Sequence, residues 1–490
     1  MKRLILILVM LPLFSFSQGI DNLWMMGYEN FSGPPFGGIN LDFSSGAPVI
    51  SYHLRQINYG DISVTICDST GNFLFTTNGV YLTNSTGDTM LNGSGLSPSY
   101  YTTAVADYGL YVPQTALAIP DPASPTKYYL FHNTVDDSVA YAYKMYYSKI
   151  DMSLDGGLGA VTNKNVVLIN DTLVPGRLTA TRHGNGRDWW VVFHQAHTNR
   201  YYIYIVDPSG VHLHSTQNIG VNMVFDKGQF CFSPDGSRFA QYGASNDLDI
   251  MDFDRCNGVL SNCVHISIND SAVGAGIAFS PNSSVLYATS TSYVYQFDLT
   301  ASNISSTKAT VAVWDTFYSP SPPFATTFYL EQLAPDGKIY ISCTNGTLDI
   351  HSIDNPDSLG MACNVCQHCV HLPAYDGFTI PNMPNYHLGS LAGSQCDTLT
   401  AGVEAISDKN MSVNLFPNPA REKLYASFTL DETPTQWKIY NAIGERCSVS
   451  SNVLNHGEYI EFDLSALPVG IYFVEFDFKD QKVVKKLVRE

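Results

Sequence analysis

The sequence has little charge, and above all little positive charge. Only 14% of its 490 residues are charged, and 26 Lys and Arg stand against 44 Asp and Glu, which gives a net charge of −18. Residues 18–412 hold 15 basic and 33 acidic side chains, so almost the whole excess lies there. Such a surface repels phosphate backbones and anionic lipid, and we therefore expect no nucleic-acid partner.

Long hydrophobic runs are missing as well. The best candidate is residues 4–14, which follow Lys2 and Arg3 and precede two small serines. This pattern is typical of a signal peptide, which we place at residues 1–17. It is too short for a membrane span, which needs about 18 or more apolar residues, and no other segment reaches that length. We therefore expect Sec export to the periplasm and no transmembrane segment in the mature protein.

The sequence contains none of the familiar catalytic motifs. There is no Gly-x-Ser-x-Gly elbow, no phosphate-binding Gly-rich loop and no His-Glu-x-x-His helix. Active sites can also be assembled from loops that are distant in sequence, so these absences make an enzyme less probable without excluding one. We name no catalytic residue, and we expect no cofactor and no metal.

What the chain does contain is β-forming residues and turns. It is rich in Tyr, Thr, Ser, Asn and Gly, and stretches with helical periodicity are nearly absent, which predicts an all-β protein. One device repeats: the end of an apolar strand, a turn of the Pro-Asp-Gly type, and a second alternating strand. It occurs at residues 232–240, 279–288 and 333–341, and looser copies lie upstream at residues 68–75, 125–130 and 184–191.

A spacing of about fifty residues suits one four-stranded propeller blade per repeat. We therefore predict a β-propeller of about seven blades over residues 18–395. The alternative is a tandem of β-sandwiches in which the turns are coincidental. In either fold the variable content lies in the loops.

The last part of the chain has a pattern of its own. Five short alternating runs predict antiparallel strands, and the prolines before them mark the entry to a separate module. The runs are residues 424–430, 436–440, 459–464, 471–476 and 483–488. We predict a small immunoglobulin-like β-sandwich at residues 413–490, joined to the propeller by a linker at residues 396–412. A generic adhesion domain is the alternative.

Short motifs stand in a fixed order within this module. The residues that define them are Pro417, Asn418, Pro419, Gly444, Gly470, Tyr472, Lys485 and Lys486. In this order they resemble the type A C-terminal sorting domain of the type IX secretion system of the Bacteroidetes. The resemblance implies that the type IX machinery is a partner, that the protein is secreted or displayed on the outer surface, and that the module is removed on export.

The rest of the chain has a second resemblance. Residues 252–261 and 379–389 carry motifs similar to those of the secreted propeller proteins that precede this sorting domain in Bacteroidetes. Members of that group are mostly uncharacterised. The resemblance therefore implies a propeller architecture and a secreted location, and leaves the ligand open.

Ten cysteines enter an oxidising compartment, where disulfides are favoured. Cys256 and Cys263 bracket six residues that could form a hairpin loop, so we expect them to pair. A bond from Cys363 to Cys396 would tie the last blade shut.

Cys366 and Cys369 would then pair locally or stay reduced. With Cys363 and the interleaved His368 and His371 they also have the spacing of a zinc site, so a structural metal or free thiols are the alternatives.

Three functional classes remain open. The first is a surface-displayed binding or scaffolding propeller whose ligand is a glycan or a protein, held by exposed aromatic residues. We place this role on Trp314 and Tyr318, which lie beside the proline-rich loop at residues 319–323, although packing between blades is the alternative for either ring. The second class is a secreted hydrolase or lyase acting on polysaccharide or peptide, and the third is a purely structural surface component.

Overall fold

The computed structural model describes residues 19–136, 141–271, 273–319, 324–397, 413–428, 434–441, 445–454, 459–478 and 482–490. The chain divides into two compact units, Met1–Leu399 and Thr400–Glu490. The expected signal peptide, most of the expected linker and Gly444 lie outside the described residues. Within the described residues, no helix is long and apolar enough to cross a membrane.

Within its described residues, the first unit contains seven antiparallel sheets of three or four strands that follow one another along the chain. The first two have three strands and the other five have four, and in each sheet consecutive strands are neighbours. Their strands are β1 (Leu23–Tyr28), β2 (Gly37–Asp42), β3 (Val49–His53); β4 (Val64–Cys67), β5 (Phe73–Thr77), β6 (Leu82–Asn84); β7 (Ala116–Pro120), β8 (Lys127–His132), β9 (Ala142–Asp151), β10 (Ala160–Leu173); β11 (Thr179–Arg182), β12 (Trp189–His194), β13 (Arg200–Asp207), β14 (Gly210–Asn218); β15 (Gly228–Phe232), β16 (Arg238–Gly243), β17 (Asp247–Asp254), β18 (Val259–Ile266); β19 (Ala275–Phe279), β20 (Val285–Ser290), β21 (Tyr293–Asp298), β22 (Ala309–Val313); and β25 (Phe328–Leu333), β26 (Ile339–Cys343), β27 (Gly346–Ile353), β28 (Val365–Gly377).

Short elements decorate these sheets. They are α1 (Tyr100–Ala104), four 3-10 turns at Gly19–Asp21, Asp155–Gly157, Ile304–Thr307 and Gly360–Cys363, and a two-stranded hairpin of β23 (Tyr318–Ser319) and β24 (Phe324–Ala325).

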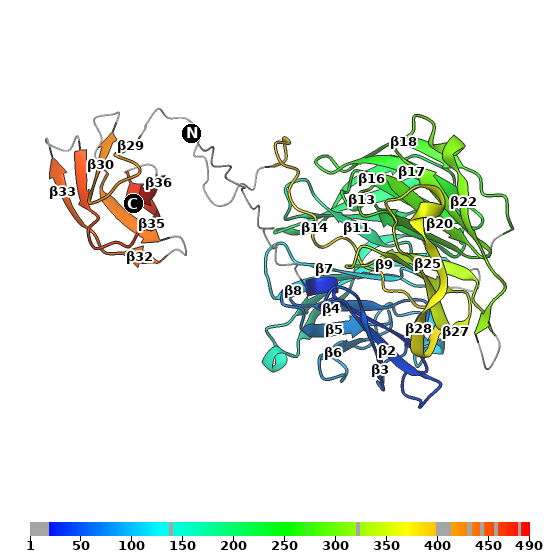
Figure 1. Ribbon diagram of the computed structural model, residues 1–490. Helices are drawn as coiled ribbons and strands as arrows, with labels where there is room; N and C mark the ends of the chain where they lie inside the picture. The colour runs from blue at the N-terminus through cyan, green and yellow to red at the C-terminus, as the bar shows by residue number, and fades with distance from the viewer. Residues whose placement is uncertain are drawn as a thin grey trace, which may run out of the picture. The chain divides into compact units, whose positions relative to one another are not determined.

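The sheets close into a seven-bladed propeller. The first strand of a sheet contacts the first strand of the next, as β4 does with β7 and β15 with β19. The last sheet returns to the first, because β28 packs against β1 and β2, and Figure 1 shows the yellow β27 and β28 beside the blue β2 and β3. The Trp24 ring meets Tyr340 edge-on across this junction, with centroids 5.7 Å apart. The all-β prediction is confirmed, and β1, β4, β7, β11, β15, β19 and β25 are the inner strands.

Each of the six repeated turns joins the first and second strands of a blade. In the turn after β15, Gly236 has φ 71°, a left-handed conformation that favours glycine, and Asp235 Oδ1 accepts a hydrogen bond of 2.9 Å from the Ser237 amide. Gly337 takes the same place after β25, with φ 81°. The repeat read from the sequence is therefore the inner hairpin of blades two to seven.

After blade seven the chain runs along the inner strands. Pro381 forms a parallel bridge with Ser63, just before β4. The side-chain amide of Asn382 donates to the carbonyl oxygens of Ala116 and Leu178, at 2.9 and 3.0 Å. Ala116 belongs to β7, and Leu178 is the residue just before β11. This segment therefore fills part of the central channel and ties three blades together.

The second unit is a sandwich of two four-stranded sheets, in the orders β29-β30-β34-β33 and β32-β31-β35-β36. Alternate residues point inward, and Leu424, Ile439, Phe462, Val474 and Phe476 form its buried centre. Its strands are β29 (Val413–Phe416), β30 (Lys423–Phe428), β31 (Gln436–Asn441), β32 (Arg446–Cys447), β33 (Ser450–Leu454), β34 (Tyr459–Asp463), β35 (Gly470–Asp477) and β36 (Lys482–Arg489).

Candidate functional sites

Three side chains from three blades meet where the inner strands begin. Asp61 precedes β4, Lys227 precedes β15 and Tyr329 is the second residue of β25. The Lys227 ammonium lies 2.8 Å from Asp61 Oδ2, and the Tyr329 hydroxyl donates to the same oxygen at 3.3 Å. Burial raises the pKa of the Asp61 carboxyl, and the charge of Lys227 offsets part of this rise.

A second carboxyl belongs to the same cluster. Asp376, near the end of β28, is 1% exposed and accepts a hydrogen bond of 3.2 Å from the Gly27 amide. Burial raises the pKa of the Asp376 carboxyl to about 8. The hydrogen bond from Gly27 acts to lower this pKa, and the charge of Asp61 acts to raise it. Among the described residues, Asp61 Oδ1 and Asp376 Oδ2 have no hydrogen-bond partner. We call Asp61, Lys227, Tyr329 and Asp376 the carboxyl cluster.

Tyrosines surround this cluster. Burial, followed by the charges of neighbours that include Asp61, raises the pKa of Tyr111 to about 12. Burial also raises the pKa of Tyr101, and the charge of Asp61 adds to this rise. Beyond them a groove of about 910 Å³ passes Tyr108 and Phe31, whose side chains are 43% and 50% exposed. The cluster was not predicted from the sequence. Its only available signal was a polar residue placed next to an apolar inner strand.

The channel also contains a cavity of about 290 Å³, lined by Gln114, Gln229, Glu331 and Asn382 among others. Gln229 joins three inner strands, because its amide oxygen accepts from the backbone amides of Ile277 and Glu331, at 3.0 and 2.9 Å. Burial raises the pKa of the Glu331 carboxyl to about 8, partly offset by Thr289. The glutamines thus replace the ladder hydrogen bonds that adjacent inner strands do not make with each other.

Trp314 and Tyr318, the residues assigned to ligand binding, lie together at the edge of blade six. Their ring centroids are 5.6 Å apart in an edge-on arrangement. Trp314 is half-buried and donates from Nε1 to the Thr326 hydroxyl at 3.4 Å, whereas Tyr318 is 51% exposed. Phe324 faces solvent from the paired strand β24, with 41% of its side chain exposed.

The expected cysteine pairs are wrong. Cys256 is bonded to Cys396, with Cα atoms 5.4 Å apart, and Cys263 and Cys363 are free. Cys256 lies in the β17–β18 turn while Cys263 is four residues into β18, roughly 13 Å further along at a strand's rise per residue, which is beyond disulfide reach. Cys363 is fully buried, and Cys396 is bonded to Cys256, so Cys363 and Cys396 do not pair.

The local pair is present, because Cys366 and Cys369 form a disulfide. Within the described parts of the chain, no group of three or more His, Cys, Asp or Glu residues is placed to hold a metal.

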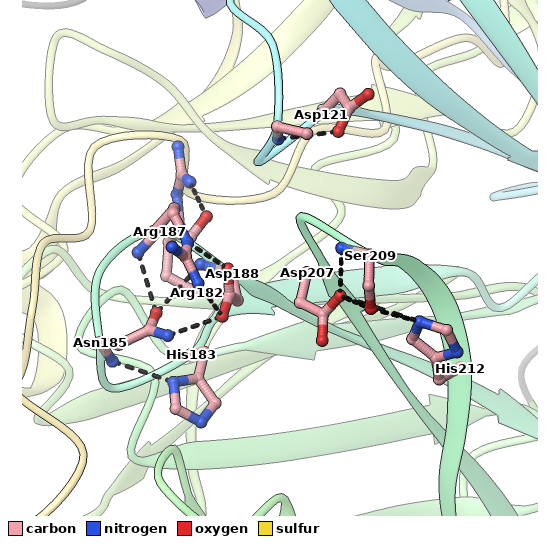
Figure 2. Close-up of polar contacts among 10 residues, drawn as sticks. Asp121, Arg182, His183, Asn185, Arg187, Asp188, Asp207, Ser209 and His212 are labelled. Carbon is pink, nitrogen blue, oxygen red and sulfur yellow. Dashed lines mark hydrogen bonds and ion pairs between the residues drawn. The ribbon is translucent and has the colours of Figure 1, made fainter. Parts of the chain in front are cut away.

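One constellation has the residue types of a catalytic triad without its geometry. Figure 2 shows Asp207, Ser209 and His212 at the turn between β13 and β14. The Ser209 hydroxyl donates to Asp207 Oδ1 at 2.5 Å and lies 2.8 Å from His212 Nε2, so the serine stands between the acid and the imidazole. In a triad the imidazole stands between the other two. Asp207 also accepts from the Ser209 amide, which makes this an Asx turn of the hairpin.

The described motif residues of the second unit lie in the proline turn after β29 and on β35 and β36. Asn418 donates to the Lys486 carbonyl at 2.7 Å and accepts from the Val488 amide at 2.9 Å, which ties the proline turn to β36. The buried Tyr472 donates to the Pro468 carbonyl at 2.8 Å. Gly470 opens β35, Lys485 is half-buried and Lys486 is exposed.

Comparison with known proteins decides the nature of this unit. The family model described as "Secretion system C-terminal sorting domain" matches residues 414–490. These residues are a type IX C-terminal sorting domain. The sorting domain implies contact with the type IX machinery and export, followed by secretion or attachment to the outer surface.

Several solved structures are similar to a part of the chain. One is a protein provisionally described as a 6-phosphogluconolactonase from Bacteroides uniformis, at 13% identity over 68% of this chain and 92% of that one, with a TM-score of 0.40. A protein of unknown function from Desulfotomaculum acetoxidans is 14% identical over 74% and 100%, with a TM-score of 0.38. The β-propeller domain of Cps50 (Swd1) from Myceliophteria thermophila is 9% identical over 67% and 90%, with a TM-score of 0.38. No curated protein matches the chain.

Proposed function

We propose that the propeller is the cargo of the sorting domain, and that it works outside the cell as a binding or scaffolding module for an uncharged glycan. The observation that carries the proposal is a group of three aromatic residues, Trp314, Tyr318 and Phe324, of which Tyr318 and Phe324 are exposed and Trp314 is half-buried. Tyr318 and Phe324 stand on a two-stranded hairpin, where they contribute little to the buried core, whereas Trp314 precedes the hairpin and packs partly against the core of blades six and seven. Delivery follows the route expected from the sequence: Sec export to the periplasm, then the type IX machinery.

The chemistry of the surface narrows the ligand class. Sugar rings present apolar C–H faces that stack on Tyr and Trp, while a tyrosine hydroxyl can bind sugar hydroxyls. The net charge of −18 disfavours polyanions such as nucleic acid. A protein ligand would use the same aromatic anchors, and it is the second ligand class that the experiment addresses.

Retention of the purified full-length protein on cellulose, starch and yeast mannan tests the proposal. We expect Trp314→Ala and Tyr318→Ala to weaken retention on the bound polymer at least tenfold, about 1.4 kcal/mol. Tyr100→Ala is the matched control, because Tyr100 is 85% exposed on α1, in a different blade region, and its loss should leave retention unchanged. Equal retention of the wild type and all variants would rule out binding by Trp314 and Tyr318. Self-association with no retention would favour the purely structural role.

A second candidate function is acid–base catalysis on a polysaccharide or peptide at the carboxyl cluster. It is favoured by two buried carboxyls with raised pKa values that interact with each other beside an ammonium group. Product release from the same polymers should then disappear in Asp61→Asn, while Asp88→Asn, an exposed acid of the groove, should retain it. Retention without any product release would leave only the binding role.

A further inference from the structure

We propose that the Cys366–Cys369 disulfide is a thiol-sensitive clasp that holds the aromatic loop, residues 313–319, in its binding shape. The inference rests on the proposed function for its binding consequence, because it concerns control of the site that contains Trp314 and Tyr318. Its structural consequence, the order of the loop, can be measured without any ligand. The two cysteines lie on β28, in the blade that follows the loop.

The disulfide closes a bulge in β28. Along the β27–β28 ladder, Ile350 faces Val370 and Ser352 faces Cys366, so three residues of β28 stand opposite the single residue His351. The three are Gln367, His368 and Cys369. A bulge re-aims the side chains of the strand that carries it, and here the bond between Cys366 and Cys369 ties its two ends.

The two residues between the cysteines hold the aromatic loop. Gln367 donates from Nε2 to the Val313 carbonyl at 2.9 Å, and its Oε1 accepts from the Asp315 amide at 3.1 Å. His368 Nε2 lies 2.9 Å from Asp315 Oδ2. The His368 ring stacks on Phe317, with centroids 4.0 Å apart and planes inclined by 18°. The bulge therefore grips the loop at three of its seven residues.

These contacts are well placed to orient the rings of Trp314 and Tyr318. Asp315 and Phe317 lie between Trp314 and Tyr318 in sequence and are adjacent to them, so fixing Asp315 and Phe317 restricts the backbone that carries the two binding rings. His368 itself has φ 43°, a left-handed conformation that is costly for a residue with a β-carbon. A closed ring over these residues restrains that conformation, and opening the ring lets the backbone relax.

Opening requires two electrons from an external dithiol. Its thiolate attacks the sulfur of Cys369, the residue of the pair that is exposed, and the S–S bond breaks. Cys366 leaves as a thiolate and takes up a proton, and the second thiol of the reductant resolves the mixed disulfide. The protein gains two thiols and the reductant becomes a disulfide. Cys363, three residues upstream, is fully buried and does not take part.

Hydrogen exchange on the full-length protein, before and after treatment with dithiothreitol, tests the clasp. The Asp315 amide should exchange at least tenfold faster after reduction, because its acceptor is Gln367. The Trp314 amide is the internal control, since it donates to the Ser292 carbonyl at 2.9 Å and not to the bulge. A C366S/C369S double variant should show the fast exchange without reductant and no further response. A C256S/C396S variant should respond as the wild type does.

Retention on cellulose, starch and mannan, measured in parallel, separates this inference from the proposed function. We expect reduction to weaken retention at least fivefold in the wild type and to have no effect on C366S/C369S. If retention depends on Trp314 and Tyr318 but neither exchange nor retention responds to reduction, the clasp is overturned and the binding site stands. If exchange responds and no polymer is retained in either state, the clasp of the loop stands and the proposed glycan function falls.

Discussion

Cys256 and Cys396, which are 140 residues apart in sequence, are joined by a disulfide. The bond fastens the last described stretch of the propeller unit onto the β17–β18 turn of blade five. Nearby hydrogen bonds strengthen this attachment: the Leu391 amide donates to the Gly184 carbonyl at 2.7 Å, and the Arg255 guanidinium donates to the Gly389 carbonyl at 2.5 Å. The chain that leaves blade seven through the channel is therefore anchored before it continues towards the sorting domain.

Removal of this bond should destabilise the propeller. Because the bond closes a loop of 140 residues, Cys396→Ser should lower the free energy of unfolding by about 2 to 5 kcal/mol, measured by chemical denaturation. Cys263→Ser, at a free and half-buried cysteine, is the matched control and should change the free energy of unfolding less. Non-reducing peptide mapping should find Cys256 linked to Cys396. A Cys256–Cys263 peptide would contradict the structure.

The buried carboxyls should make stability depend on pH. The pKa values of Asp376 and Glu331 are raised to about 8 in the folded protein, so the stability that they contribute is fully present below pH 4 and is lost as pH rises towards 8. Asp376→Asn keeps an acceptor for the Gly27 amide and removes the titration. We expect this variant to be more stable than the wild type at pH 8, by about 1 to 3 kcal/mol.

Urea denaturation at pH 5 and pH 8 measures this difference. Asp88→Asn, at an exposed acid, serves as the control and should follow the wild-type profile. Parallel profiles for Asp376→Asn and the wild type would show that Asp376 titrates in its ordinary range.

A buried ion pair should contribute more to the free energy of unfolding than an exposed one. Arg177, 2% exposed, pairs with Asp226, 7% exposed. Arg177→Met would leave the Asp226 carboxylate buried without its partner, and we expect a loss of about 3 to 5 kcal/mol in unfolding free energy. Lys127→Met breaks a pair with Asp151 in which the lysine is 38% exposed, and it should cost no more than about 1 kcal/mol. Equal losses in thermal or urea unfolding would refute the distinction.

Export should depend on the sorting domain. Deleting residues 413–490 removes the whole sandwich, so the folded propeller should accumulate in the periplasm while the full-length chain leaves the cell. Fractionation followed by immunoblotting measures the distribution. Detection of the truncated chain in the medium or at the cell surface would mean that another segment directs export.

Much of the fold could be predicted because it is written in local patterns. The repeated turns at residues 232–240, 279–288 and 333–341 carry their own chemistry: a proline with fixed φ, an aspartate or asparagine that accepts from a following amide, and a glycine or serine in a left-handed conformation. Such features act within a few residues, so they can be recognised without knowing the fold. The ordered motifs of the sorting domain are local in the same sense.

The candidate sites are different because they depend on which loops meet. The sequence put Trp314 and Tyr318 four residues apart, and only the hairpin of β23 and β24 brings their rings into contact and leaves Tyr318 exposed. The carboxyl cluster was missed because Asp61 and Asp376 are 315 positions apart in the printed sequence and approach each other only when the ring of blades closes.

The amino-acid sequence by itself determined the all-β class, the repeating hairpin and the sorting domain, because each rests on residues close together in the chain. Tertiary structure alone decided the cysteine pairing and the charge state of the buried acids. Cys256 bonds to Cys396 instead of the nearer Cys263 because β18 carries Cys263 away from the turn, while the chain's return past blade five brings Cys396 within reach. The raised pKa of Asp376 has the same origin, since it is burial between the first and last blades that removes water from the carboxyl.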